Sequence, residues 1–239
     1  MSAINAHDRL MVALDVPDAR RAEILLDQLQ DSIRVVKIGL ELFTGVGPAV
    51  VRLAQDRGMQ VFLDLKFFDI GETVKRATAR VADLGVQFLT VHAHRKTMQA
   101  AVEGKRAYPD LKILAVTVLT NFDLEDVKES GSSWSISELV VARAKATAEV
   151  GCYGVVASGQ EPKAIRQAVG QSLAIVTPGV RPVGADAHDQ ARVTTPSQAI
   201  EQGSDYLVVG RPIRDAADPQ LVARAIISEM QTALNRRMS

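Results

Sequence analysis

Three charged residues interrupt an otherwise apolar segment, residues 61–74, which reads VFLDLKFFDIGETV. Asp64 and Lys66 lie inside the segment, and Asp69 follows just past its end. Charges are costly to bury unless they are paired or take part in chemistry. A lysine between two carboxylates is held in its ammonium form, which makes it a fixed proton donor. This spacing therefore predicts either a proton-transfer site or a structural cluster of ion pairs.

Charged residues also accompany the two apolar segments that precede this one. Asp15 lies in LMVALDV and Lys37 lies in RVVKIGL. Side chains two residues apart on a strand share a face, so Asp64 and Lys66 are expected to point the same way. If the three segments are neighbouring strands, all four charges meet at one corner. A carboxylate fixed there would repel an anionic group of a substrate placed against it.

A second group of residues has the composition of a phosphate site. Glycine lets a backbone N–H approach an oxyanion, and arginine offers a two-pronged contact. Taken singly, each arginine is equally typical of a solvated surface. The group comprises Gly210 and Arg211 in YLVVGR, Arg181 in TPGVRP, and Gln190 in the segment that follows it.

The elements that must position these residues alternate regularly along the chain. Eight short apolar segments predict strands over residues 10–16, 34–40, 60–66, 88–93, 112–119, 154–158, 173–180 and 206–211. Apolar residues at helical spacing predict helices over 19–30, 47–58, 73–85, 97–107, 137–151, 161–169, 196–203 and 218–235.

This alternation predicts the α/β class, with a parallel sheet covered by helices. At 239 residues, eight repeats favour a closed (β/α)8 TIM barrel, with residues 1–239 as a single domain. The first turn reads DVPDARR rather than the glycine-rich fingerprint of an open dinucleotide-binding sheet. Two irregular segments, 121–135 and 181–195, follow strands and are expected at the active-site end of the barrel.

Composition excludes several classes of protein. The 28 acidic and 28 basic residues balance, so no basic excess indicates nucleic-acid binding. The single cysteine, Cys152, excludes an internal disulfide and is typical of a reducing compartment. The N-terminal MSAINAHDRL lacks the pattern of a signal peptide, and the apolar segments are too short to span a membrane. We therefore expect a cytoplasmic protein that binds neither nucleic acid nor membrane.

A metal site is not expected from the histidines. His92 and His94 share a face of the fourth predicted strand, but no carboxylate or cysteine completes a plausible set of ligands.

The chain resembles the orotidine 5′-monophosphate decarboxylase family. The family motif Asp-x-Lys-x-x-Asp is present as Asp64-Leu65-Lys66-Phe67-Phe68-Asp69. VALDV, VKIGLELF, VTVLT, VTPGVRP, DQARVTTP and DYLVVGRPI also look like family segments, in family order. The resemblance implies a TIM-barrel homodimer that converts orotidine 5′-monophosphate to UMP without cofactor or metal.

The resemblance also implies a role for each candidate residue. Lys66 would protonate C6 as carbon dioxide departs, with Asp64 against the scissile carboxylate and Lys37 in the same catalytic charge network. Asp69 and Thr73 would reach across a two-fold interface into the partner's site. Substrate contacts would come from Asp15 and Lys37 at the ribose, Thr120 at the pyrimidine, and Arg181, Gln190, Gly210 and Arg211 at the phosphate.

One stretch departs from the commonest family pattern. Many members read Asp-Ile-Pro-Asn-Thr where this chain has Asp-Ile-Gly-Glu-Thr, and Phe68 occupies a position that is often histidine. Gly71 in place of proline makes the start of the next helix less rigid. We expect these changes to affect dimer stability or loop order rather than the chemistry.

Two alternatives are distinguishable by experiment. A magnesium-dependent 3-keto-L-gulonate 6-phosphate decarboxylase shares the Asp-x-Lys-x-x-Asp motif but needs an acidic ligand from the second strand, where Glu41 lies beyond Lys37. Full activity in excess chelator would exclude it. A non-catalytic nucleotide-binding barrel would not consume orotidine 5′-monophosphate in an absorbance assay.

Overall fold

Eight parallel strands close into a barrel in the order of the sequence. A computed structural model describes residues 5–129, 131–182 and 194–238. The last strand pairs with the first, with Val12 opposite Val209, and this pairing closes the sheet. The strands are β1 (Leu10–Ala13), β2 (Val35–Gly39), β3 (Gln60–Phe67), β4 (Phe88–His92), β5 (Lys112–Val116), β6 (Gly154–Val156), β7 (Ala174–Thr177) and β8 (Tyr206–Val209).

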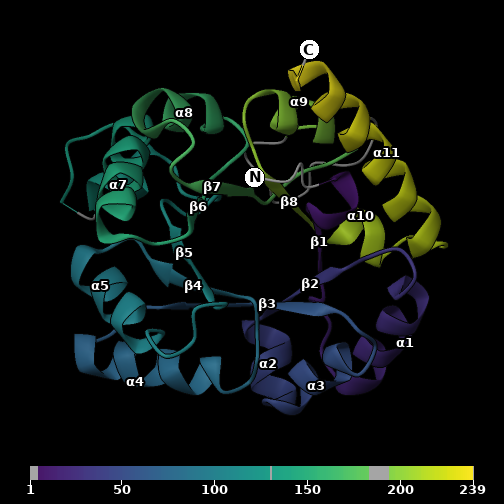
Figure 1. The fold of residues 1–239 in the computed structure, drawn as a ribbon. Helices are drawn as coiled ribbons and strands as arrows, with labels where there is room; N and C mark the ends of the chain where they lie inside the picture. The colour runs from purple at the N-terminus through teal and green to yellow at the C-terminus, as the bar shows by residue number, and fades with distance from the viewer. Residues whose placement is uncertain (1–4, 130, 183–193, 239) are drawn as a thin grey trace.

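Helices surround the strands on the outside of the barrel (Figure 1). This arrangement confirms the predicted (β/α)8 fold. A short 3-10 helix, η1 (Ala6–Asp8), precedes the first strand. The α-helices are α1 (Ala19–Leu29), α2 (Leu40–Val46), α3 (Ala49–Gln55), α4 (Gly71–Ala82), α5 (Arg95–Gly104), α6 (Leu124–Glu129), α7 (Ile136–Val150), α8 (Pro162–Val169), α9 (Pro196–Glu201), α10 (Arg211–Arg214) and α11 (Pro219–Met238).

Local sequence explains where several of these helices begin. The Asp18 carboxylate accepts a hydrogen bond from the Arg21 amide at 2.8 Å and caps α1. Ser135 before α7 and Thr195 before α9 each form a reciprocal capping box with the residue three positions on. Side-chain caps of this kind satisfy amide groups that have no partner within the helix.

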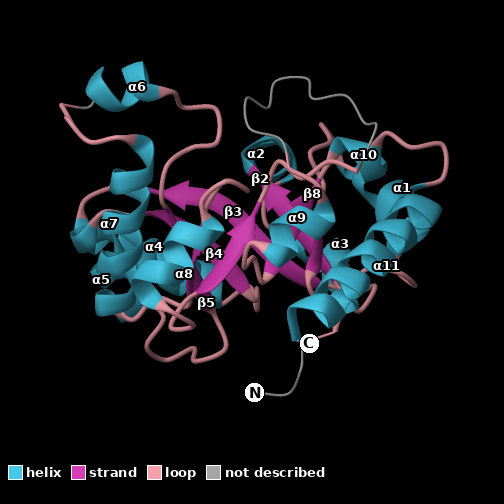
Figure 2. Ribbon diagram, turned by 90° about the horizontal axis from the view of Figure 1, so that it is seen from above, coloured by secondary structure: helices cyan, strands magenta, loops and turns pink. Residues whose placement is uncertain are grey.

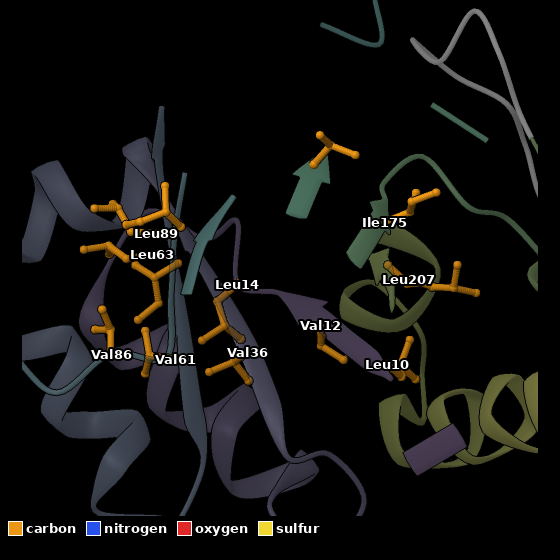
Figure 3. Close-up of a cluster of buried hydrophobic side chains, with 14 of the residues drawn as sticks. Leu10, Val12, Leu14, Val36, Val61, Leu63, Val86, Leu89, Ile175 and Leu207 are labelled. Carbon is orange, nitrogen blue, oxygen red and sulfur yellow. The ribbon is translucent and has the colours of Figure 1, made fainter. Parts of the chain in front are cut away.

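Strand side chains alternate between two hydrophobic layers. Leu10, Val12 and their counterparts on other strands point outward and pack beneath the helices (Figure 3). Met11 and Ala13 point inward and belong to a second cluster inside the barrel. The nearly continuous apolar strand sequences follow from this burial on both faces.

Aromatic side chains fill the amino-terminal end of the barrel interior. The rings of Phe88 and Tyr206 lie 5.7 Å apart, and the hydroxyls of Tyr153 and Tyr206 are 3.0 Å apart. The Lys112 ammonium lies 4.9 Å from the centre of the Phe88 ring. Because these large side chains occupy the amino-terminal end, the internal space is left at the carboxyl ends of the strands.

The predicted strands extend too far toward their carboxyl ends. β5 ends at Val116 rather than residue 119, and β7 ends at Thr177 rather than residue 180. Val118 and Val180 are nevertheless buried. Val180 forms an isolated bridge with Thr194, outside the named strands, and burial continues past the ends of both β5 and β7.

Three short helices lie where no helix was expected. α2 follows β2 directly, α6 lies within the predicted irregular segment 121–135, and α10 begins where β8 was expected to continue. In Figure 2, α6 and α10 lie at one end of the barrel, and the C-terminal turn of α11 lies at the other. None of the helices within the described residues is long and apolar enough to cross a membrane.

Candidate active site

A cavity of about 460 Å³ opens at the carboxyl ends of the strands. Its apolar wall comes from residues such as Ala13, Val116 and Val156, which end their strands. Its polar lining comprises Asp15, Lys37, Asp64, Lys66, Thr120, Arg181, Arg211 and Arg214. The cavity therefore combines alternating charges with a group of arginines, as the sequence predicted.

Strand alternation carries the first three charges into this cavity. Val35 and Phe62 face the barrel interior, so Lys37 and Asp64, two residues further on, face it as well. Asp15 lies two residues beyond the end of β1 at Ala13 and continues the same inward row. The sequence placed Asp15 within the strand, and the structure places it in the following loop.

The four charges form a continuous acid–base chain. The Lys37 ammonium lies 2.9 Å from Asp15 Oδ1 and 3.6 Å from Asp64 Oδ2. The Lys66 ammonium lies 2.9 Å from the same Asp64 oxygen. One carboxylate oxygen therefore faces two ammonium groups, and the predicted juxtaposition of the four residues is confirmed.

Asp64 is ionised despite its burial. Burial alone would raise the pKa of its carboxyl. The charges of Lys37 and Lys66, together with hydrogen bonds from Lys66 and Thr90, outweigh this effect and lower the pKa. The site therefore holds a fixed negative charge between two positive ones.

The backbone that carries Asp64 and Lys66 is irregular. The pairing of β3 with β4 shifts between Leu63 and Phe67, and Lys66 has a φ of 49°. A left-handed backbone is rare outside glycine and costs about 1–3 kcal/mol. The sequence argument assumed a regular strand, but the strand is irregular from Asp64 to Lys66. The two side chains nevertheless form an ion pair.

The arginines that line the cavity follow β7 and β8. Arg181 is 5% exposed, and its Nη1 donates to the Val180 carbonyl at 3.0 Å. Arg211 begins α10 and, with Gly210, lines the same cavity. Gln190, predicted for this corner, lies outside the described residues.

Asp69 and Thr73 do not join the four charges within this chain. Both are exposed, and neither is among the described residues that line the cavity. The Asp69 carboxylate accepts a hydrogen bond from the Ile70 amide at 2.6 Å. On either side, Phe68 and Ile70 are 62% and 78% exposed, which makes an apolar surface around the acid.

Sequence reasoning missed two residues of the site. Arg214 lines the cavity, and its Nη1 donates to the Asp15 backbone carbonyl at 2.7 Å. Its position three residues after Arg211 is informative only because the chain forms the helix α10 there, and a helical turn brings such residues together. Thr90 contacts Asp64 from the neighbouring strand. It carried no sequence signal, because its importance depends on the pairing register.

The two histidines stack against Phe68 rather than facing a cluster of acids. The Phe68 ring lies 4.7 Å from that of His94 and 5.6 Å from that of His92. Burial lowers the pKa of both imidazoles. Within the described residues, no group of three or more His, Cys, Asp or Glu side chains is placed to hold a metal. Glu41 lines a different cavity on the outer rim.

Comparison with known proteins covers almost the whole chain. The model of the "Orotidine 5'-phosphate decarboxylase / HUMPS family" matches residues 8–226. An orotidine 5′-phosphate decarboxylase from Rhodopseudomonas palustris strain BisA53 is 47% identical over 227 residues, which are 95% of this chain and 96% of the relative. The corresponding protein of Afipia carboxidovorans is 48% identical over 229 residues, 96% of this chain and 97% of the relative.

Solved structures agree with these matches. The orotidine 5′-phosphate decarboxylase of Lactobacillus acidophilus superposes with a TM-score of 0.81 at 35% identity, covering 93% of this chain and 99% of that one. The Pyrococcus horikoshii protein of the same description gives 0.75 at 26% identity, with coverage of 93% and 99%. On this evidence of sequence and fold, the chain belongs to the orotidine 5′-phosphate decarboxylase / HUMPS family.

Proposed function

We propose that the 460 Å³ cavity is where this chain decarboxylates orotidine 5′-monophosphate to UMP in pyrimidine synthesis. Relatives with this activity in their names share 47–48% of the sequence over nearly the full length. The observation that carries the assignment of the site is the chain Asp15–Lys37–Asp64–Lys66, which lines one cavity together with a group of arginines.

The two ends of the cavity suit the two ends of the nucleotide. Arg181 and Arg211 suit the phosphate, because a guanidinium binds phosphate oxygens with two parallel hydrogen bonds. Asp15 and Lys37 suit the ribose hydroxyls, and Thr120, which also lines the cavity, suits the pyrimidine edge. The carboxylated carbon would consequently lie against Asp64 and Lys66.

The chemistry follows from fixed charges without a cofactor. The bond from C6 to the carboxylate carbon breaks, carbon dioxide leaves, and the electron pair remains on C6. The Lys66 ammonium stabilises this developing negative charge and then donates its proton to C6. Asp64 repels the carboxylate of the bound substrate, and this repulsion disappears as carbon dioxide departs.

Phosphate binding contributes although the phosphate does not react. Contacts far from C6 supply binding energy that holds the substrate carboxylate against a like charge. Arg181 and Arg211 should accordingly be as important for turnover as the pair Asp64 and Lys66. Turnover of the nucleoside lacking its phosphate should be far slower than that of the nucleotide.

We further propose that the active unit is a homodimer. Lys66 has Asp64 beside it, whereas Asp69 of the same motif is exposed outside the cavity. Phe68 and Ile70 surround Asp69 with exposed apolar surface of the kind that marks an interface. Contact between two copies here would bring Asp69 and Thr73 toward the partner's site.

We also propose that the protein works in the cytoplasm. A buried free thiol at Cys152 fits this reducing compartment.

The decisive test of Lys66 is its replacement by alanine. We expect K66A to lose turnover, followed as the absorbance change of orotidine 5′-monophosphate, while it still binds UMP in calorimetry. Retained UMP binding would show that the variant folds. Lys145→Ala, an exposed lysine on α7, is the matched control and should turn over at the wild-type rate. Wild-type turnover by K66A would refute its proposed role.

A further inference from the structure

Thr90 is completely buried beside the catalytic charges. It lies in the middle of β4, two residues after Phe88, and faces the barrel interior. Its side chain is 0% exposed and is not among the described residues that line the cavity. Any effect of Thr90 on the reaction must therefore pass through its neighbours.

In the pairing of β3 with β4, Thr90 lies opposite the irregular part of β3. Leu63 pairs with Leu89 and Phe67 pairs with Val91. Between these two pairs, β3 contains residues 64–66, whereas β4 contains Thr90 alone. Bulges of this type commonly re-aim side chains beside active sites. Here one threonine stands opposite the segment that contains both Asp64 and Lys66.

The hydroxyl of Thr90 connects these two residues directly. It lies 2.9 Å from the Lys66 backbone nitrogen and 2.8 Å from Asp64 Oδ1. A backbone N–H can only donate, so the threonine oxygen accepts from Lys66. The single hydroxyl proton is then free to be donated to the Asp64 carboxylate. The Thr90 hydroxyl thus acts both as an acceptor, from the Lys66 amide, and as a donor, to Asp64.

These contacts restrain the features that the reaction needs. Asp64 Oδ1 is held by Thr90, which leaves Oδ2 directed at the ammonium groups of Lys66 and Lys37. The amide of Lys66 is held where its φ is 49°, a conformation that persists only when the surroundings support it. We propose that Thr90 is a positioning residue that sets the Asp64 carboxylate and the Lys66 backbone for proton transfer; this inference rests on the proposed roles of that pair.

Valine tests the proposal because it replaces the hydroxyl with a methyl group of similar size. We expect T90V to lower kcat by about tenfold or more, the factor that corresponds to a modest loss of transition-state stabilisation. Affinity for UMP should change by less than about threefold, because the arginines and Asp15 are untouched. T90S keeps the hydroxyl and should restore kcat to within about threefold of wild type.

A matched control separates positioning from packing. Thr78 on α4 is also fully buried, and its hydroxyl has no hydrogen-bond partner within the described residues. T78V should therefore keep wild-type kcat. If T90V does not fold, T90A and T90S provide the same comparison, since they differ only in the hydroxyl.

The outcomes are distinguishable from failure of the proposed function itself. Wild-type kcat in T90V, or equal losses in the serine and hydroxyl-free variants, would overturn the role of Thr90 while K66A stays inactive. A loss of UMP affinity parallel to the loss of kcat would also overturn it, because a general structural defect acts on both. Activity in K66A would instead remove the catalytic pair on which the inference rests.

Discussion

At the scale of single residues, Asp64 holds two positive charges together. Its Oδ2 lies within 3.6 Å of the ammonium groups of both Lys37 and Lys66. Without this carboxylate, both ammonium groups would lose the negative charge that they share, while Lys37 would keep its ion pair with Asp15. Removing one partner from a buried ion pair typically costs about 3 kcal/mol or more. We therefore expect Asp64 to affect stability as well as the proposed reaction.

The pH dependence of stability tests this role of Asp64. Its pKa is lower in the folded chain than in the unfolded one, so its stabilisation is complete above about pH 4, the unfolded value. The contribution is lost as pH falls through the folded pKa. We expect D64N to lower the free energy of unfolding at pH 7 by about 3 kcal/mol. In urea titrations, the gap between the two proteins should narrow below about pH 4.

A result with the opposite sign would contradict this account. If the gap between wild type and D64N widened as the solution became more acidic, the carboxyl pKa would be raised rather than lowered. In that case the two ammonium groups would not be the main neighbours of Asp64 in solution.

At the scale of elements, β6 and α4 contain glycines with contrasting surroundings. A Cβ on Gly154 in β6 would overlap the backbone carbonyl of Ala174 on β7. A Cβ on Gly71, at the start of α4, would lie 3.7 Å from Ala100 Cβ, an ordinary contact. The close approach of β6 to β7 therefore requires glycine at position 154. At position 71 there is enough space for a side chain.

The two alanine variants should consequently shift the melting temperature in opposite directions. G154A forces two paired strands apart and should cost about 3 kcal/mol, which lowers Tm by about 6 °C or more in a domain of this size. G71A reduces the freedom of the unfolded chain and should raise Tm by about 1–3 °C. Calorimetry at one protein concentration measures both. An unchanged Tm in G154A would show that β6 and β7 can separate without cost.

At the scale of the whole molecule, a shared site has a consequence for mixtures of variants. K66A lacks the proposed proton donor but retains Asp69, and D69A retains Lys66. If Asp69 acts in the partner's site, a mixed dimer of these variants contains one complete site and one doubly defective site. Each variant alone contains no complete site.

Activity should therefore reappear when the two inactive variants are mixed and allowed to exchange subunits. Random exchange at equal concentrations makes half of the dimers mixed, which corresponds to about a quarter of the wild-type activity. Mixing K66A with T78V provides the control, because subunit exchange there leaves the number of complete sites unchanged and activity should not rise. If the mixture of K66A and D69A stays inactive although exchange is complete, Asp69 does not act across the interface.

The predictions from sequence succeeded where the physics is local and periodic. Apolar segments alternating with helical spacing sufficed for the (β/α)8 barrel, because burial on both faces of a parallel strand imposes that pattern. Alternation along a strand also sufficed to place Lys37 and Asp64 on the inward face, whereas Lys66 meets Asp64 through an irregular stretch of β3. The arginine group after β7 and β8 followed from the usual place of phosphate sites in this fold.

What the sequence alone determined is thus the order of the elements and the residue types that meet at the carboxyl end of the barrel. The tertiary structure alone decided where the strands end, which short helices follow them, and which side chain stands opposite the irregular segment of β3. Val118 and Val180 are buried although they lie beyond the ends of β5 and β7, and apolarity does not reveal where a strand ends. Thr90 meets Asp64 and Lys66 only through the register of β3 with β4, which depends on contacts between residues distant in the chain.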